Sequence, residues 1–331
     1  MPRLMYSNPL LDRVGNTPLA FIDGIYVKLE CANPGGSVKD RIGKFMLEEG
    51  RRRGELKPTD TVVEATSGNT GIAIAMVARE LGHPAIIWMP EHMSRERVEM
   101  LEALGADVRL TPESEGFEGP IARRDAYKGR DGYFVPDQFA NPDNVRCHEL
   151  TTGVELLGQL DDYGCLLIDA FVAGVGTGGT LMGVGRALKK AMPGVQIVAV
   201  EPEESAVMSG GKPGSHAIQG IGDGFIPDLI DMDFVDRIIA VAAADAKTAS
   251  QRIREQHGYC VGISAGANMV AAKRLLEEGL TAATIWPDCS DRYVSMGLDA
   301  PSEHGSTCPL RAGCAERWER MFEPAATACS P

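Results

Sequence analysis

Short apolar runs alternate with longer segments of helical character along most of this chain. Runs of strand type occupy residues 61–64, 85–89, 107–110, 166–172, 196–200 and 282–286, and helical segments occupy 71–81, 94–104, 119–127, 145–160, 180–192, 246–257 and 264–278. Strands that alternate with helices predict βαβ units, and therefore parallel sheets. A stretch rich in Gly, Pro and Asp at 129–143 interrupts the series. The alternation therefore predicts two α/β units.

The composition excludes several classes of protein. A length of 331 residues is typical of about two domains. The chain has 33 basic and 46 acidic residues, for a net charge of −13, which disfavours nucleic acid as a partner. Its apolar runs are far shorter than the roughly 20 residues that cross a bilayer. Eight cysteines without a Cys-x-x-Cys pair, and the absence of a signal segment, indicate reduced thiols and a cytoplasmic protein.

A glycine loop between an expected strand and an expected helix reads Gly174-Val175-Gly176-Thr177-Gly178-Gly179. Backbone amides of such a loop and the helix N-terminus bind anions, so the loop predicts a phosphate site. It also satisfies the Gly-x-Gly-x-x-Gly fingerprint of NAD-binding oxidoreductases, with Glu201 near the position of a ribose ligand. The hydroxyls of Thr177 and Thr180 favour a terminal phosphate over a bridging pyrophosphate.

A second loop of small residues reads Ala65-Thr66-Ser67-Gly68-Asn69-Thr70-Gly71 and precedes a helical segment that is apolar on every side. Its amides and hydroxyls predict a site for a carboxylate, and the Asn69 amide offers both a donor and an acceptor to a ring oxygen.

A third segment, 33–41, leads into a helix for which Ser37 is the expected N-cap. Lys39 then lies in the first helical turn. The positive end of the helix dipole disfavours an ammonium there and lowers the pKa of the amine, as an imine-forming lysine requires.

Together, these segments resemble the fold type II pyridoxal-phosphate enzymes, in particular the cysteine synthase (O-acetylserine sulfhydrylase) branch that also contains cystathionine β-synthase. The resemblance extends over about residues 7 to 298. It is carried, in order along the chain, by Gly15-Asn16-Thr17-Pro18-Leu19, residues 33–41, 64–71, Met89-Pro90-Glu91, Gln138-Phe139-Ala140-Asn141-Pro142, Thr151-Thr152-Gly153, residues 174–180 and 209–214, Gln219-Gly220-Ile221-Gly222, Gly262-Ile263-Ser264-Ala265-Gly266 and Asp291-Arg292-Tyr293. The dinucleotide reading explains only one of these segments.

The resemblance assigns a role to each loop. Lys39 would bind pyridoxal 5'-phosphate covalently, Asn69 would bond its phenolic oxygen, and Ser264 would meet its pyridine nitrogen. The phosphate would bind to Gly176, Thr177, Gly178, Gly179 and Thr180. The substrate carboxylate would bind to Thr66, Ser67, Gly68 and Thr70, with Gln138 and Gly220 nearby. A serine hydroxyl cannot stabilise a protonated ring as a carboxylate would, which implies β-replacement rather than transamination.

The resemblance also implies an architecture and an activity. The architecture is α/β, with two three-layer domains and mostly parallel sheets: residues 1–41 with 144–298 would form a large cofactor-binding domain, 42–143 a small mobile domain, and 299–331 a tail of unknown role. The activity is a cysteine synthase reaction, in which sulfide replaces the acetoxy group of O-acetyl-L-serine. The resemblance further implies a homodimer and makes serine acetyltransferase a candidate partner.

Several alternatives stay open at this point. Homocysteine in place of sulfide would give a cystathionine β-synthase, and Asp223 leaves room for a different acceptor. O-Phosphoserine as the donor would favour an added guanidinium, whereas Lys212 is the only fixed cation between residues 201 and 219. An inactive regulatory homologue is a further alternative. Cys289 stands at a usual serine position, and the spacing of His304, Cys308, Cys314 and Cys329 matches no compact zinc site, so no metal is expected.

Overall fold

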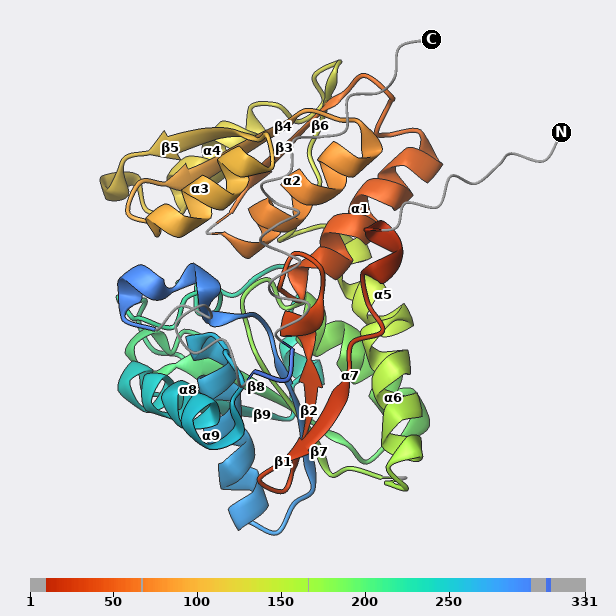
Figure 1. The fold of residues 1–331 in the computed structure, drawn as a ribbon, viewed down its shortest axis with the longest axis vertical. Coiled ribbons are helices and arrows are strands. Elements are labelled where there is room, and N and C mark those ends of the chain that lie inside the picture. Colours follow the sequence, from red (N-terminus) through yellow and green to blue (C-terminus); the bar gives the residue numbers. More distant parts are fainter. Residues whose placement is uncertain (1–9, 67, 166, 299–307, 311–331) are drawn as a thin grey trace, which may run out of the picture.

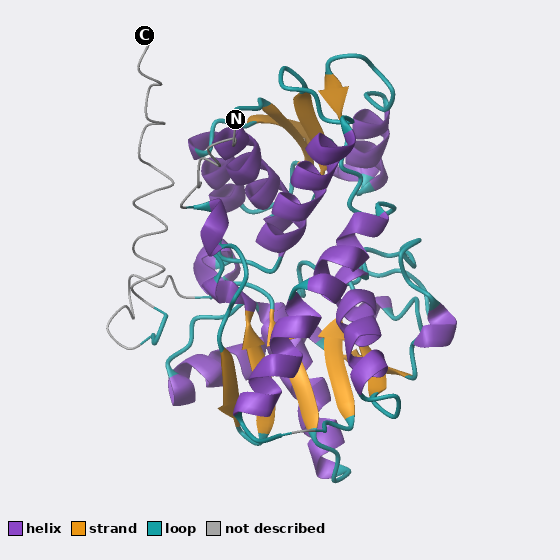
Figure 2. Ribbon diagram, turned by 90° about the vertical axis from the view of Figure 1, so that its right-hand side faces the viewer, coloured by secondary structure: helices purple, strands orange, loops and turns teal. Residues whose placement is uncertain are grey.

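The computed structural model describes residues 10–66, 68–165, 167–298 and 308–310. These residues form two β-sheets with helices packed against them, one sheet above the other in Figure 1. Figure 2 shows the same two bodies after a 90° turn. The prediction of an α/β fold with mostly parallel sheets is confirmed.

The larger sheet has six strands in the order β1-β2-β10-β7-β8-β9. Strand β1 pairs antiparallel with β2, and every other pair in this sheet is parallel. The β1–β2 hairpin therefore joins the sheet through β10. The strands are β1 (Leu19–Ile22), β2 (Ile25–Leu29), β7 (Ala170–Gly174), β8 (Gln196–Pro202), β9 (Arg237–Val241) and β10 (Ala282–Trp286).

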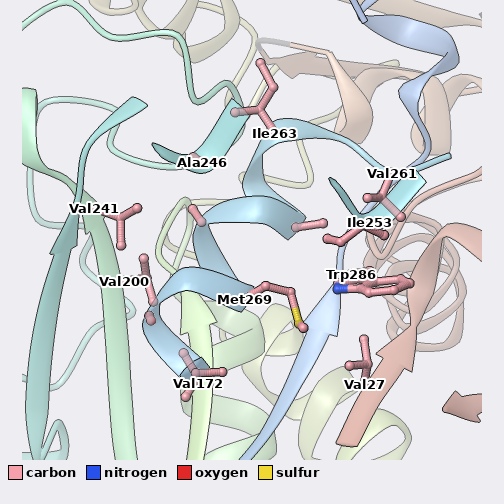
Figure 3. Packing of buried hydrophobic residues seen from close by; sticks show 14 of the residues in the cluster. Val27, Val172, Val200, Val241, Ala246, Ile253, Val261, Ile263, Met269 and Trp286 are labelled. Atoms are coloured by element: carbon pink, nitrogen blue, oxygen red, sulfur yellow. The ribbon is translucent and has the colours of Figure 1, made fainter. Parts of the chain in front are cut away.

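Helices cover both faces of the larger sheet because its strands are apolar on both sides. In β8, Val198 and Val200 pack with α8 and α9, whereas Ile197 and Ala199 pack with α6 and α7. Figure 3 shows the first of these clusters, with Met269 of α9 beside strand valines. The helices around this sheet are α5 (Pro142–Leu150), α6 (Thr152–Asp162), α7 (Gly179–Ala191), α8 (Ala243–His257) and α9 (Ile263–Glu277).

The smaller sheet has the order β5-β4-β3-β6 and is parallel throughout. Its strands are β3 (Thr61–Ala65), β4 (Ala85–Pro90), β5 (Asp107–Thr111) and β6 (Tyr133–Phe134), and its helices are α1 (Lys39–Arg53), α2 (Asn69–Leu81), α3 (Arg95–Ala103) and α4 (Glu118–Asp125). Helix α2 is buried from Thr70 to Ala78, as its uniformly apolar sequence indicated. All four strands fall inside the segment 42–143, and the division into a large and a small mobile domain stays a prediction.

Two sequence-based element boundaries were wrong. The expected helix 145–160 is two helices, because the backbone turns at Thr151, whose hydroxyl donates to the Cys147 carbonyl at 2.7 Å. The expected strand 166–172 begins only at Ala170, and Leu167 is 71% exposed in the preceding loop. Strands β1, β2, β6 and β9 were not anticipated.

The described residues contain no helix of the length and hydropathy that a bilayer crossing requires. Of the four C-terminal His and Cys residues considered above, only Cys308 lies within the described part of the chain. Apart from residues 308–310, the predicted tail, 299–331, lies outside the described part of the chain.

Candidate active site

Lys39 is the first residue of α1, and the segment before it is held by the loop that follows β10. The Val38 N–H donates to the Pro287 carbonyl at 2.8 Å, and Ser37 forms an isolated bridge with Asp288. Val38, not Ser37, is the N-cap residue, although the Ser37 hydroxyl accepts a hydrogen bond from the Lys39 N–H at 3.3 Å. The lysine is therefore fixed between the two sheets.

Burial lowers the pKa of the Lys39 amine to about 8, and the carboxylates of Asp223 and Asp288 partly oppose this effect. The helix dipole was the expected cause of this shift, but removal of the ammonium from water is the largest cause. The Nζ atom lies 3.5 Å from Thr177 Oγ1 in the glycine loop. Most of this amine is still an ammonium at pH 7, but the uncharged, nucleophilic fraction is far larger than for a lysine with the ordinary pKa of 10.5.

The glycine loop between β7 and α7 has a backbone that side chains would disrupt. A Cβ on Gly176 would lie 2.5 Å from the Gly220 carbonyl oxygen. Gly178 has a φ of +85°, and a Cβ there would lie 2.7 Å from the side chain of Ile230. Gly179 begins α7, so the amides of the loop lie at a helix N-terminus, where an anion is favoured.

Two side chains that sequence reasoning missed hold the threonines of this loop. Asn144 Nδ2 donates to Thr177 Oγ1 at 2.9 Å and to the Gln138 carbonyl at 2.8 Å. The ring nitrogens of His148 are hydrogen bonded to hydroxyls of Thr152, at 2.9 Å, and Thr180, at 3.2 Å. Burial lowers the pKa of His148 to about 3, so its imidazole is neutral near pH 7. Neither α5 residue belongs to a motif that could have signalled this function.

The loop between β3 and α2 carries hydroxyls next to a buried amide. Thr70 Oγ1 donates to Gln138 Oε1 at 2.6 Å, and Gln138 Nε2 donates to the Ala65 carbonyl at 3.0 Å. Thr66 Oγ1 accepts from the Gly68 N–H at 3.0 Å. Ser67 lies outside the described residues. The segments that sequence reasoning joined at one carboxylate site are thus adjacent in space.

Asn69 is held by two charged side chains. Its Nδ2 donates to Asp288 Oδ2 at 2.7 Å, and its Oδ1 accepts from Arg292 Nη1 at 2.7 Å. The Tyr293 hydroxyl also donates to Asp288 Oδ2. Burial raises the pKa of Asp288, and the Arg292 guanidinium opposes that rise. The amide of Asn69 is therefore fixed in one orientation.

One cavity, here called the central cavity, brings these loops together. It is lined by Val38, Lys39, Thr66, Asn69, Thr70, Arg97, Gln138, Phe139, Gly174, Gly176, Thr177, Gly178, Thr180, Gln219, Gly220, Ile221, Asp223, Ser264, Ile285, Pro287 and Asp288. Of the described site residues expected from the sequence, Gly68 and Gly179 are not among its lining residues. Arg97, Asp223 and Asp288 add charges to the cavity that the assigned roles do not include.

Glu201, the candidate ribose ligand of the dinucleotide alternative, has other contacts. Its carboxylate accepts hydrogen bonds from the Met208 N–H at 2.8 Å, the Ser209 N–H at 3.1 Å and the Ser209 hydroxyl. These bonds fix the loop after β8 and occupy both carboxylate oxygens.

Comparison with known proteins decides the family, because residues 10–287 match the family described as pyridoxal-phosphate dependent enzymes. The chain belongs to this family. It is 48% identical over 296 residues to a cysteine synthase of Staphylococcus aureus (strain Mu50 / ATCC 700699), covering 86% of this chain and 94% of that protein. The family is also the one that the sequence motifs indicated.

Solved structures are similar over nearly the whole chain. A cysteine synthase of Entamoeba histolytica superposes with a TM-score of 0.83 at 35% identity, covering 98% of each chain. An O-acetylserine dependent cystathionine beta-synthase of Helicobacter pylori superposes with a TM-score of 0.82 at 36% identity, covering 89% of this chain and 100% of that one.

The residues of the central cavity fit pyridoxal phosphate, on which the family depends. The glycine loop suits a phosphate, since its backbone amides lie at the N-terminus of α7. A buried amine of lowered pKa, Lys39, and a buried hydroxyl at the start of α9, Ser264, line the same space. This donor set matches an aldehyde, a phosphate and a ring nitrogen.

Proposed function

We propose that this chain is a cysteine synthase, which converts O-acetyl-L-serine and sulfide to L-cysteine and acetate. The observation that carries the proposal is the Lys39 amine, with a pKa of about 8, in one cavity with the glycine loop and Ser264. The 48% identity to a cysteine synthase over 86% of the chain supports the same reaction.

Bound pyridoxal phosphate supplies an aldehyde that condenses with amines and a ring that withdraws electrons from Cα of the bound amino acid. With the cofactor bound, Lys39 would be its covalent anchor. The Lys39 Nζ would also be the base that removes the proton from Cα of the substrate and later returns it. The position of Nζ 3.5 Å from Thr177 Oγ1 keeps this base at the edge of the phosphate loop.

The remaining residues bind and orient. The amides of Gly176, Gly178 and Gly179, with the hydroxyls of Thr177 and Thr180, would hold the phosphate. Ser264 would bond the pyridine nitrogen, and Asn69, whose amide Asp288 and Arg292 already orient, would bond the phenolic oxygen. The hydroxyls of Thr66, Ser67 and Thr70, on the loop that includes Gly68, would bind the substrate carboxylate, with Gln138 and Gly220 beside them.

Borohydride reduction tests the anchor directly. The purified protein should be yellow, and reduction followed by peptide mass mapping should place a pyridoxyl group on Lys39. A group on another lysine would contradict the assignment. Rates with sulfide and with homocysteine, each measured with O-acetylserine, O-phosphoserine and serine, test the reaction itself. Higher catalytic efficiency with homocysteine and serine would favour a cystathionine β-synthase and leave the Lys39 assignment unchanged.

The proposal includes a cytoplasmic homodimer. Leu150 at the end of α5 is 52% exposed and Val154 on α6 is 55% exposed, and apolar side chains in such positions suit a subunit interface. The described cysteines are in the reduced, thiol form, which suits a reducing compartment. Serine acetyltransferase as a partner follows from the family resemblance.

A further inference from the structure

Arg97 is a buried cation in the wall of the central cavity. It lies on α3, and its side chain is among the largest fully buried ones of the described residues, with 2% of the residue exposed. Its guanidinium donates from Nη1 to Gln219 Oε1 and lies 4.8 Å from the centroid of the Tyr293 ring. The side chain thus extends from the smaller sheet's layer of helices to loops of the larger body.

The charge of Arg97 is incompletely compensated. Among the described residues no carboxylate forms an ion pair with it, and its buried Nε has no hydrogen-bond partner. The other guanidiniums near the cavity are paired, Arg41 with Glu30 and Glu155, and Arg292 with Asp291. Asp288 interacts with the Arg97 charge electrostatically but forms no ion pair with it, and a buried cation without a direct ion pair is costly unless a ligand supplies the missing acceptors. The incompletely compensated charge of Arg97 therefore favours the binding of an anion.

The position of Arg97 indicates which anion. A Cβ placed on Gly68 would lie 2.4 Å from both Cδ and Nε of Arg97, so the side chain rests on the loop proposed to hold the substrate carboxylate. Its other end bonds Gln219, next to Gly220, across the cavity. An amino acid whose carboxylate binds the loop at Thr66 and Thr70 would extend its β-substituent along this side of the cavity.

We propose that Arg97 binds the leaving group of the donor. Its guanidinium donates hydrogen bonds to the carboxylate of the departing acetate. This inference rests on the proposed function. In the elimination, the Cα–H proton goes to Lys39 Nζ and its electron pair forms the Cα=Cβ double bond. The Cβ–O bond breaks, and its electron pair leaves with acetate as an anion. A guanidinium forms two parallel hydrogen bonds to a carboxylate, so Arg97 stabilises acetate as its charge develops.

Two donors with different leaving groups test the proposal. Arg97→Gln should slow acetate release from O-acetylserine by about 10- to 100-fold in a single turnover without sulfide. Chloride release from 3-chloroalanine should slow by less than about 3-fold, because a monatomic leaving group cannot use the paired N–H groups. Arg97→Lys should recover only part of the acetate rate. Arg95→Gln is the matched control, since the neighbouring Arg95 side chain is 87% exposed, and it should change neither rate.

Binding of L-alanine, followed by the change in cofactor absorbance, separates the leaving group from the α-carboxylate. Arg97→Gln should leave the affinity for alanine, which has no leaving group, within about 3-fold of wild type. Equal loss with both donors, or weakened alanine binding that matches the loss of acetate release, would overturn the proposal and make Arg97 a structural link to Gln219. Wild-type protein that releases acetate but forms no cysteine would refute the proposed function alone, while the donor ratio still decides the role of Arg97.

Discussion

Removing the Lys39 amine should stabilise the cofactor-free protein at neutral pH. Burial lowers the pKa of Lys39 from 10.5 to about 8, so the folded protein holds an ammonium at pH 7 in a place that disfavours it. The difference of about 2.5 corresponds to about 3 kcal/mol, at 1.36 kcal/mol for each tenfold change in proton affinity. Lys39→Met should therefore raise the free energy of unfolding by about 3 kcal/mol at pH 7.

The lowered pKa of Lys39 also predicts how the stability difference between the two proteins changes with pH. Between pH 8 and 10.5 the unfolded chain keeps the Lys39 proton while the folded protein loses it, so wild-type stability rises with pH through this window. The advantage of Lys39→Met should then shrink to about 1.5 kcal/mol at pH 9.5. Urea unfolding of both cofactor-free proteins at the two pH values measures the difference.

The control for this experiment is Lys190→Met, at an exposed lysine that pairs with Glu149 at the surface of α7. That change should alter stability by less than about 1 kcal/mol. A Lys39→Met protein that is no more stable than wild type at pH 7, or an advantage that does not fall as pH rises, would refute the burial argument.

Three further substitutions test the site. Ser264→Asp should slow cysteine formation at least about 10-fold while cofactor binding persists, because a carboxylate would stabilise the protonated form of the pyridine nitrogen. Ser264→Ala should have a milder effect, and wild-type rates in the Asp variant would contradict this prediction. Asp223→Ala should raise the catalytic efficiency with homocysteine by about 3- to 10-fold, because the Asp223 carboxylate repels the carboxylate of homocysteine. The catalytic efficiency with sulfide should change less. Equal effects on the two reactions would show that Asp223 does not face the acceptor. Gly178→Ala should cost about 2 to 3 kcal/mol in urea unfolding, because φ is +85° and the new methyl would meet Ile230, and an unchanged midpoint would refute this reading of the loop.

The sequence predicts the parts of the site where the local backbone conformation restricts which residue can be present. Gly176 and Gly178 are recognisable because no other residue fits their positions, and Lys39 is recognisable because it follows a loop and begins a helix. Such requirements are local, so a single sequence records them.

The local sequence does not reveal which side chains are buried by segments that are distant in the chain. Arg97 and Arg95 stand two positions apart in one charged helix, yet the first is buried and the second exposed. The difference comes from the packing of α3 against other elements, including η6 (Ser290–Arg292), which lies almost 200 residues later in the chain. The pKa of Lys39 follows the same rule, since its main cause is burial by segments distant in the chain.

The strand order has a consequence for synthesis of the chain. Strand β2 finds its parallel neighbour only in β10, more than 250 residues later, and the segment before Lys39 is hydrogen bonded to Pro287 just beyond it. A nascent chain that stops before Ala282 can form the β1–β2 hairpin but lacks the parallel strand that joins this hairpin to the rest of the sheet, and contacts of such long range are slow to form. We therefore expect the cofactor to bind only after nearly the whole chain has emerged from the ribosome.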